Sequence, residues 1–233
     1  MGPHDGQPLV TAGAPLADAP GAVVLLHGRG DSARGILGLA DEIGRPDLAW
    51  LAPQAAGGAW YPHRFLAPLE ANEPGLSSGI EAVLRAVAQA EAAGTPRARV
   101  VLGGFSQGAC LALETAARHA GRWGGVFALS GGLLGTGPRP AGAPRVSGMG
   151  GTYAEKAFDY DGSLDGVPIF LGCSDVDPHI PLTRVERTAE VLHRLGAEVD
   201  ARVYPGMGHT VNRDEIDVVR VMLGGVAEER QAG

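Results

Sequence analysis

Residues 100–114 read VVLGGFSQGACLALE, an apolar run that passes through Gly104-Phe105-Ser106-Gln107-Gly108 into a second, helix-like stretch. The apolar run predicts a buried strand, and the stretch after Ser106 predicts a helix. A serine between a strand and a helix lies on a tight turn that exposes its hydroxyl group. Glycines on both sides remove the Cβ atoms that would block such a turn. The segment therefore predicts that Ser106 is a nucleophile.

A second segment fits the same five-residue pattern of two glycines around a serine. It is Gly75-Leu76-Ser77-Ser78-Gly79, and it follows residues 69–74, a polar stretch that no buried strand would use. We therefore expect Ser77 or Ser78 to cap the helix that follows. Sequence context separates the two segments, because only Ser106 lies between a strand pattern and a helix pattern.

Apolar runs of strand length alternate with longer amphipathic stretches along the chain. The expected strands are 22–26, 48–52, 100–102, 125–129, 167–171 and 199–204. The expected helices lie near 33–44, 79–93, 107–119, 182–195 and 212–223. This alternation predicts an α/β fold with a mostly parallel sheet and helices on both faces. The Gly- and Pro-rich residues 135–151 are interpreted as a loop, so we expect one domain over residues 1–233, with residues 1–20 at its periphery.

Composition and charge exclude several classes of protein. Hydrophobic residues make up 45% of the chain and charged residues 19%, which is typical of a folded globular protein. A net charge of −7 argues against nucleic acid or an anionic membrane as a partner. No apolar run is long enough to span a membrane, and the N-terminus lacks the pattern of a signal peptide. Cys110 and Cys173 lack metal-ligand spacing, so we expect no metal site, buried thiols and a cytoplasmic location.

A serine nucleophile needs a general base, and that base needs an acid to orient it. On a sheet of this kind the three residues follow the order serine, acid, histidine. His209 lies in a glycine-rich loop between the last expected strand and the last expected helix, at the same sheet edge as Ser106. The acid should follow the preceding strand, where both Asp175 and Asp177 lie. The pattern leaves both open, and the second carboxylate would serve as a helix cap or a loop hydrogen-bond acceptor. His4, by contrast, is expected in a frayed terminus.

The oxyanion formed during acyl transfer needs two preorganised N–H donors. The backbone N–H of Gln107, at the start of the helix after the nucleophile, is one candidate. The second candidate is the backbone N–H of Arg29, in the glycine-rich loop 27–32 that follows the first central strand. Asp31 or Ser32 could cap the next helix at the same time.

These motifs resemble those of the carboxylesterase/phospholipase family of α/β-hydrolases, which includes bacterial carboxylesterases, lysophospholipases and acyl-protein thioesterases. The resemblance rests on the loop 27–31, the turn at Ser106, and the segments 177–181 and 206–209, which occur in the family's order. It implies an α/β-hydrolase fold without a large lid domain and assigns the role of the acid to Asp177. It also places the second oxyanion donor at Arg29. Many family members have leucine there, so a cation at the mouth of the site could alter substrate preference.

The resemblance further implies a substrate-lining loop over residues 53–65, with Trp60 and Phe65 as walls of the pocket. Simple anchoring of the loop is the alternative for both aromatics. The expected activity is hydrolysis of small-molecule carboxylic esters with short- or medium-chain acyl groups, through an acyl-serine intermediate and without a cofactor. A lysophospholipase or acyl-protein thioesterase is the alternative, and a non-catalytic ligand-binding protein is a remote one. Nothing in the sequence indicates the oligomeric state.

Overall fold

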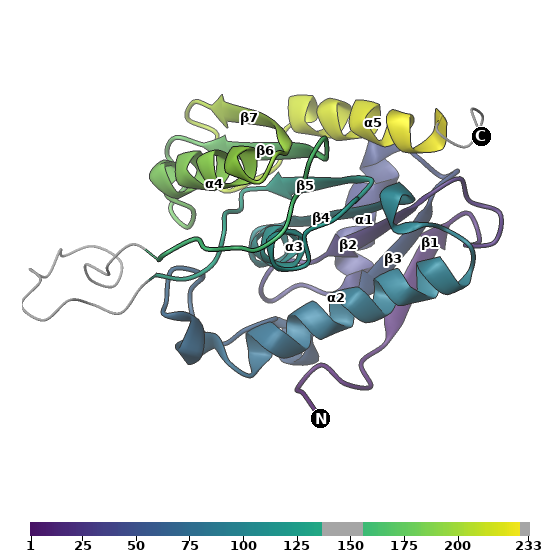
Figure 1. Cartoon of the computed structure of the whole chain (residues 1–233), viewed down its shortest axis with the longest axis horizontal. Helices are drawn as coiled ribbons and strands as arrows, with labels where there is room; N and C mark the ends of the chain where they lie inside the picture. The colour runs from purple at the N-terminus through teal and green to yellow at the C-terminus, as the bar shows by residue number, and fades with distance from the viewer. Residues whose placement is uncertain (137–155, 229–233) are drawn as a thin grey trace, which may run out of the picture.

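The computed structural model describes residues 1–136 and 156–228, and its centre is one twisted sheet (Figure 1). In these residues the sheet has seven strands in the order β1-β3-β2-β4-β5-β6-β7. The strands are β1 Leu9–Gly13, β2 Ala22–Leu26, β3 Ala49–Pro53, β4 Val100–Phe105, β5 Gly125–Leu129, β6 Pro168–Ser174 and β7 Glu198–Tyr204. Strand β1 pairs antiparallel with β3, whereas every other neighbouring pair is parallel.

All six expected strands are present, with ends that differ by at most three residues from those expected. Strand β1 was not expected, because residues 1–20 were interpreted as peripheral. It lies at the edge of the sheet and is only half buried, so its residues lack the continuous apolar run that marks a central strand. Residues 137–151 of the expected loop lie outside the described part of the chain.

Helices cover both faces of the sheet, as the alternating pattern predicts. They are α1 Ala33–Ile43, α2 Gly75–Ala92, α3 Gln107–Arg118, α4 Leu182–Arg194 and α5 Arg213–Glu228. Helices α1 and α5 pack on one face, and α2, α3 and α4 pack on the other (Figure 1). No helix within residues 1–136 and 156–228 combines the length and the apolar character that crossing a membrane requires.

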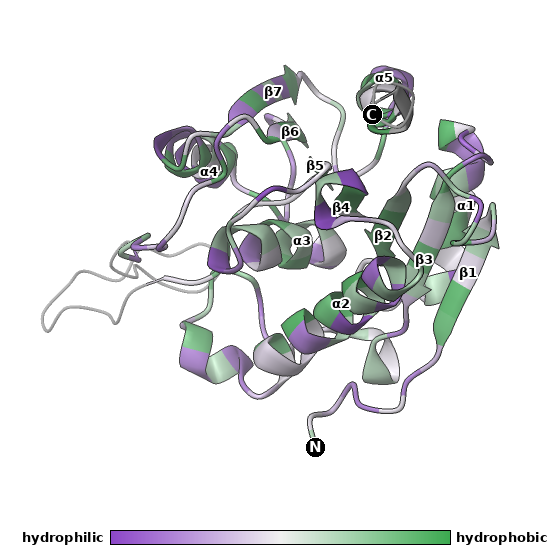
Figure 2. Ribbon diagram, turned by 45° about the vertical axis from the view of Figure 1, so that its right-hand side comes forward, coloured by the Kyte–Doolittle hydropathy of each residue, from purple (hydrophilic) through white to green (hydrophobic). Residues whose placement is uncertain are grey.

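The two faces of the sheet enclose two separate hydrophobic cores. In β2, Val23 and Leu25 pack with α1 and α5, whereas Val24 and Leu26 pack with the helices of the opposite face. Every residue of β2 is buried, because successive side chains point to opposite faces and both faces are covered. Figure 2 shows the central strands coloured as hydrophobic, whereas helix α2 carries both hydrophilic and hydrophobic residues.

The second Gly-Ser pattern lies inside helix α2, and the interpretation of its serines as caps is wrong. The helix begins at Gly75, four residues earlier than expected, and Pro74 occupies the capping position without a side-chain hydrogen bond. Both the backbone N–H and the hydroxyl of Ser77 donate to the Glu73 carboxylate. The hydroxyl of Ser78 accepts a hydrogen bond from the backbone N–H of His4.

The strand order creates a crevice between the carboxyl ends of β2 and β4. The chain runs from β2 to β3 on one side and later returns to β4 on the other side, so the loops after β2 and β4 diverge. Such a topological switch point is where open α/β sheets bind ligands. Leu26 lies opposite Gly104 in the register, so the loop 27–32 and the turn at Ser106 begin at the same level.

The turn at Ser106 depends on close contact between α3, β4 and β2. A Cβ atom on Gly108 would overlap the carbonyl oxygen of Leu26, and one on Gly104 would overlap the backbone of Gly108. Ser106 itself has φ 55° and ψ −118°, a strained conformation for a residue with a side chain. Only glycine at both flanking positions lets the helix begin so close to the strands.

Gly108→Ala is expected to lower the free energy of unfolding by about 1–3 kcal/mol, because the added methyl group overpacks this contact. Urea denaturation of the purified variant measures the change. Gly38→Ala is the matched control, since a Cβ atom at Gly38 in α1 meets nothing within 4 Å. Alanine there should raise the free energy of unfolding by about 0.5–1 kcal/mol. Equal stability of the two variants would show that the turn tolerates a side chain.

Candidate active site

Three loops at the carboxyl edge of the sheet bring Ser106, His209 and Asp177 together. Ser106 follows β4, Asp177 follows β6 and His209 follows β7. The Nε2 atom of His209 lies 2.9 Å from Ser106 Oγ, and its Nδ1 atom lies 2.7 Å from Asp177 Oδ2. The imidazole is therefore within hydrogen-bond distance of the hydroxyl on one side and the carboxylate on the other.

Asp177 is the buried member of this chain of hydrogen bonds. Its side chain is fully buried, whereas that of His209 is 17% exposed. Asp177 Oδ1 accepts hydrogen bonds from the backbone N–H groups of His179 and Ile180 at 2.8 and 3.0 Å. Burial acts to raise the pKa of Asp177, but the hydrogen bonds from His209 and from these N–H groups lower it overall. The carboxylate therefore stays ionised beside the imidazole.

The structure gives Asp175 and Asp177 different contacts. Asp175 is exposed, and its Oδ1 accepts a hydrogen bond from the backbone N–H of Gly206 at 2.7 Å. Gly206 belongs to the loop that carries His209, so Asp175 supports the position of that loop. Of the two carboxylates that the residue pattern left open, Asp177 is the one in contact with the imidazole.

The loop 27–32 lies directly beside Ser106. A Cβ atom built on Gly28 would be 3.6 Å from the Cβ atom of Ser106, so the backbone of the loop passes Ser106 at van der Waals distance. In the described residues, neither the Arg29 nor the Gln107 backbone N–H donates a hydrogen bond to another part of the chain. Gln107 is also the first residue of α3, where the helix dipole favours negative charge. Both predicted oxyanion donors thus border Ser106.

A cavity of about 610 Å³ opens beside these groups. Ser106 and His209 form part of its wall together with Arg29 and Gln107. Phe65 also lines the cavity, as expected for a substrate-facing aromatic. Further apolar wall is provided by Leu66, Ala67, Pro68, Ala71, Ile180 and Pro181. The site combines an apolar pocket with a few polar groups, which is typical of small-molecule sites.

Trp60 does not line the cavity, and the expectation that it forms a pocket wall is wrong. It is fully buried, and its Nε1–H donates to the backbone carbonyl of His27 at 2.9 Å. Its ring packs against the rings of His4 and His27, with centroids 5.4 and 5.1 Å away. Trp60 therefore anchors the loop 53–65 against the core, which was the alternative interpretation.

Gln107 holds the same loop with its side chain. Its Oε1 atom accepts from the backbone N–H of Trp60 at 2.9 Å, and its Nε2 atom donates to the carbonyl of Tyr61 at 2.9 Å. The Nε2 atom of His27 accepts from the backbone N–H of Ala55. Burial lowers the pKa of His27, so the ring remains neutral and able to accept this bond. Hydrogen bonds thus connect the residues around Ser106 to the loop 53–65, which we call the cavity loop.

Only 3% of the surface of His4 is exposed, so the expectation that it lies in a frayed terminus is wrong. Its Nδ1 atom accepts from the backbone N–H of Ala56, which leaves Nε2–H to donate to the carbonyl of Trp60 at 2.8 Å. The N-terminal segment therefore supports the cavity loop. No motif pointed to this role, because it depends on a contact between His4 and Trp60, which are 56 positions apart in the sequence.

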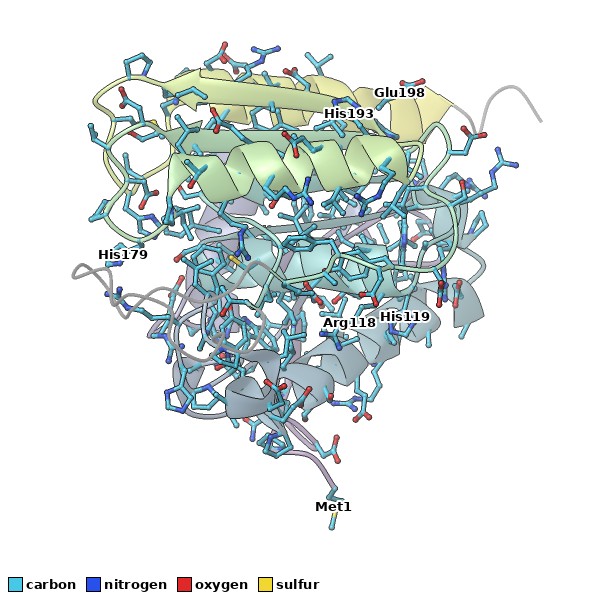
Figure 3. The ribbon with its side chains drawn as sticks, turned by 60° about the vertical axis from the view of Figure 1, so that its left-hand side comes forward. Met1, Arg118, His119, His179, His193 and Glu198 are labelled. Atoms are coloured by element: carbon cyan, nitrogen blue, oxygen red, sulfur yellow. The ribbon has the colours of Figure 1, made fainter. Side chains whose placement is uncertain are left out.

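His119 and His193 lie away from the site. His119 follows the end of α3 and His193 lies in the last turn of α4. Helices run antiparallel to the strands they follow, so both residues lie toward the opposite edge of the sheet. In Figure 3 they are at the far end of the molecule from His179, whose ring centroid is 4.7 Å from that of His209.

A capping box after His209 was missed in the sequence. The backbone N–H of Asn212 donates to Glu215 Oε2 at 2.8 Å, and the N–H of Glu215 donates to Asn212 Oδ1 at 3.0 Å. Asn212 Nδ2 also donates to the sulfur of Met207, in the loop that carries His209. The sequence did contain the signal, because an asparagine followed three residues later by a glutamate is a known pattern at the N-terminus of a helix. These bonds fix the loop to α5.

Comparisons with known proteins agree with this architecture. Residues 13–224 match the Phospholipase/Carboxylesterase family. The crystal structure of a phospholipase/carboxylesterase from Dyadobacter fermentans is 37% identical in sequence, with a TM-score of 0.84. The superposition covers 96% of this chain and 98% of that protein.

Curated relatives of the chain include fungal and yeast proteins named acyl-protein thioesterase 1. The one from Debaryomyces hansenii is 26% identical over 231 residues, which cover 90% of this chain and 92% of that protein. The one from Gibberella zeae is 32% identical over 125 residues, 54% of this chain. That match spans about half of the Gibberella zeae protein, 47% of its length.

Glu215→Gln is expected to remove a pH dependence of stability. Burial raises the pKa of the fully buried Glu215 carboxyl from 4.5 to about 7. Between these values the folded state holds a proton that the unfolded state has lost, so the free energy of unfolding falls as the pH rises. The variant should therefore gain stability relative to the wild type across this window, on the order of 1–3 kcal/mol above pH ~7.

Urea denaturation of both proteins at about pH 4, 6 and 8 measures this difference. Glu81→Gln, at an exposed position of α2, is the matched control and should shift stability by the same small amount at every pH. A Glu215→Gln curve that runs parallel to the wild-type curve would contradict the assignment.

Proposed function

The chain belongs to the phospholipase/carboxylesterase family, and on this premise we propose that it hydrolyses carboxylic esters of short- or medium-chain acyl groups through an acyl-serine intermediate. The observation that carries the proposal is the continuous hydrogen-bonded chain from Ser106 through His209 to Asp177 at the wall of a cavity. This is the geometry that a serine needs to become a nucleophile. The substrate is proposed to be a small-molecule ester.

In the first half of the reaction, Ser106 Oγ attacks the ester carbonyl carbon and His209 Nε2 takes the hydroxyl proton. The carbonyl oxygen becomes an oxyanion, which the backbone N–H groups of Arg29 and Gln107 stabilise. When the tetrahedral intermediate collapses, the bond to the alcohol oxygen breaks and His209 returns the proton to that oxygen. The alcohol leaves, and the acyl group remains on Ser106.

In the second half, a water molecule attacks the acyl carbon while His209 Nε2 accepts one of its protons. Collapse of the second intermediate releases the carboxylic acid and returns the proton to Ser106. Throughout both halves Asp177 accepts the hydrogen bond from His209 Nδ1, which selects the tautomer with a free Nε2 and stabilises the imidazolium. The lowered pKa of Asp177 suits this role, because the carboxylate must remain ionised.

The cavity suits a small-molecule ester. A volume of about 610 Å³ lies within the range of sites for small molecules, and its apolar wall suits a hydrocarbon chain. Hydrolysis of acyl-protein thioesters is the second candidate. The name of the Debaryomyces hansenii relative, which matches most of this chain, favours it. The same three residues would carry out either reaction, because both proceed by acyl transfer to serine.

Ser106→Ala is expected to abolish hydrolysis of p-nitrophenyl esters, with a loss in kcat on the order of 10⁶. The same substitution should abolish covalent labelling by a fluorophosphonate, which bonds to an activated serine oxygen and releases fluoride. If the substrate has a short or medium acyl chain, as proposed, release of nitrophenol from C2 to C16 esters should be fastest for acyl chains of about eight carbons or fewer. Retention of most activity in Ser106→Ala would rule out the proposed mechanism.

Asp177→Asn and Asp175→Asn form a matched pair that tests the acid. Asp177→Asn should lower kcat by about 10⁴, because an amide cannot hold the required tautomer of His209. Asp175→Asn should change kcat by only a few-fold, the scale of one weakened hydrogen bond. Steady-state kinetics with p-nitrophenyl butyrate measures both. A larger loss in Asp175→Asn would reverse the assignment.

A further inference from the structure

We infer that the preferred substrate carries an anionic group, such as a carboxylate, and that the Arg29 side chain recognises it. The inference rests on the proposed function, because it names the class of ester that the cavity takes. It follows from the charges that line the cavity and from the way the Arg29 guanidinium is held.

Cationic and basic side chains line the cavity, and acidic ones do not. Among the described residues, its wall contains two arginines and three histidines but neither aspartate nor glutamate: Arg29, Arg64, His63, His179 and His209. A histidine is neutral or positive, so none of the five contributes negative charge at any pH. The whole chain carries a formal charge of −7, so the cavity has the opposite sign to the protein around it.

The Asp177 carboxylate contacts the wall of the cavity from behind, through His209. Asp177 lies behind His209 and its side chain is fully buried. Both of its oxygens are already engaged by His209 and by the backbone N–H groups of His179 and Ile180. Its charge is therefore held at the imidazole, on the side away from the cavity, and does not neutralise Arg29.

The Arg29 guanidinium is fixed in place by uncharged groups. Its Nη1 atom donates to the carbonyl of Pro62 at 3.1 Å, and its Nη2 atom donates to those of Tyr61 and His63 at 2.7 and 2.6 Å. These three bonds use three of the five N–H donors of an arginine. Carbonyl dipoles orient the guanidinium without cancelling its charge, so an exposed, preorganised cation remains at the cavity.

Most other arginines of the described chain are neutralised by carboxylates. Eight of them form ion pairs with aspartate or glutamate: Arg45, Arg85, Arg97, Arg118, Arg187, Arg202, Arg213 and Arg220. Arg99, Arg184 and Arg194 also donate to backbone carbonyls, but none of the three lines the cavity. The cation at the cavity is thus held by carbonyls, whereas most other arginines in the described residues form ion pairs with acids.

The backbone of the same residue is a proposed oxyanion donor, so the cation lies within the length of one arginine side chain of the reacting carbonyl. An anion on the substrate near the ester would meet the guanidinium as the carbonyl enters the oxyanion site. Charge-assisted hydrogen bonds of this kind are about twice as strong as neutral ones. A neutral ester of the same shape would lack them.

Two pairs of esters test this inference and distinguish an anion on the acyl side of the ester from one on the alcohol side. Mono-4-nitrophenyl adipate and its methyl ester differ in a charge on the acyl side, and 4-acetoxybenzoate and its methyl ester differ in a charge on the alcohol side. After subtraction of spontaneous hydrolysis, kcat/KM should favour the anionic member of at least one pair by about tenfold, the scale of one charged hydrogen bond. Equal values, or preference for the neutral member in both pairs, would overturn the inference.

Arg29→Met should reduce that preference at least fivefold, because it removes the cation and leaves the backbone N–H. Arg122→Met, at an exposed position before β5 and outside the cavity wall, is the matched control and should retain the preference. If Arg29 only clamped the loop 61–63, its loss would slow both members of each pair equally, which would contradict the inference. Wild-type preference should also fall several-fold between about 20 and 500 mM salt, which tests the charge without a variant.

Binding to Ser106→Ala protein provides a readout that is independent of hydrolysis. Calorimetry should show a lower Kd for the intact anionic ester than for its methyl ester, and Arg29→Met in this background should remove the difference. Equal Kd values would overturn the inference even if the wild type hydrolyses both esters. If the anionic ester binds more tightly but Ser106→Ala retains activity, the proposed serine chemistry fails and the inference about charge stands.

Discussion

Close contact between helix α3 and the backbone of β2 and β4 is the constraint on which the site depends. Gly108 and Gly104 leave no room for side chains there, so the chain turns sharply at Ser106 and holds it at φ 55°. That turn raises the hydroxyl above the sheet and places the start of α3 under it. It also brings Gly28 to within contact of Ser106, so one packing arrangement positions both Ser106 and the loop 27–32.

Further hydrogen bonds hold the loops around Ser106, His209 and Asp177 in place. Asp175 bonds the loop that carries His209, and the capping box of Asn212 and Glu215 joins the end of that loop to α5. On the other side, Gln107 and His27 tie the cavity loop to the residues around Ser106. The loop that carries His209 and the loop 53–65 are therefore both held by hydrogen bonds to neighbouring elements, which reduces the reorganisation needed during a reaction.

Local patterns in the sequence predicted most of the fold and the central part of the site. The strand before Ser106 and the glycine loop before His209 can be identified because each depends on neighbouring residues. Trp60 could not be placed, since a loop pattern does not say which side of the loop faces the core. The edge strand β1 and the contact of His4 with Trp60 depend on partners more than 35 residues away, which no local pattern encodes. The chemical roles of the site residues remain predictions.

The contacts of His4 make the beginning of the chain a support of the loop 53–65, part of which lines the cavity. Its ring bridges the amide of Ala56 and the carbonyl of Trp60, and strand β1 follows five residues later. Met1 extends into solvent, so the chain can be lengthened there without entering the packed region. Shortening it past His4 would instead leave two backbone groups under the cavity without partners. Trimming this end for expression or crystallisation would thus loosen the loop beside the cavity, although the trimmed residues are far from it in sequence.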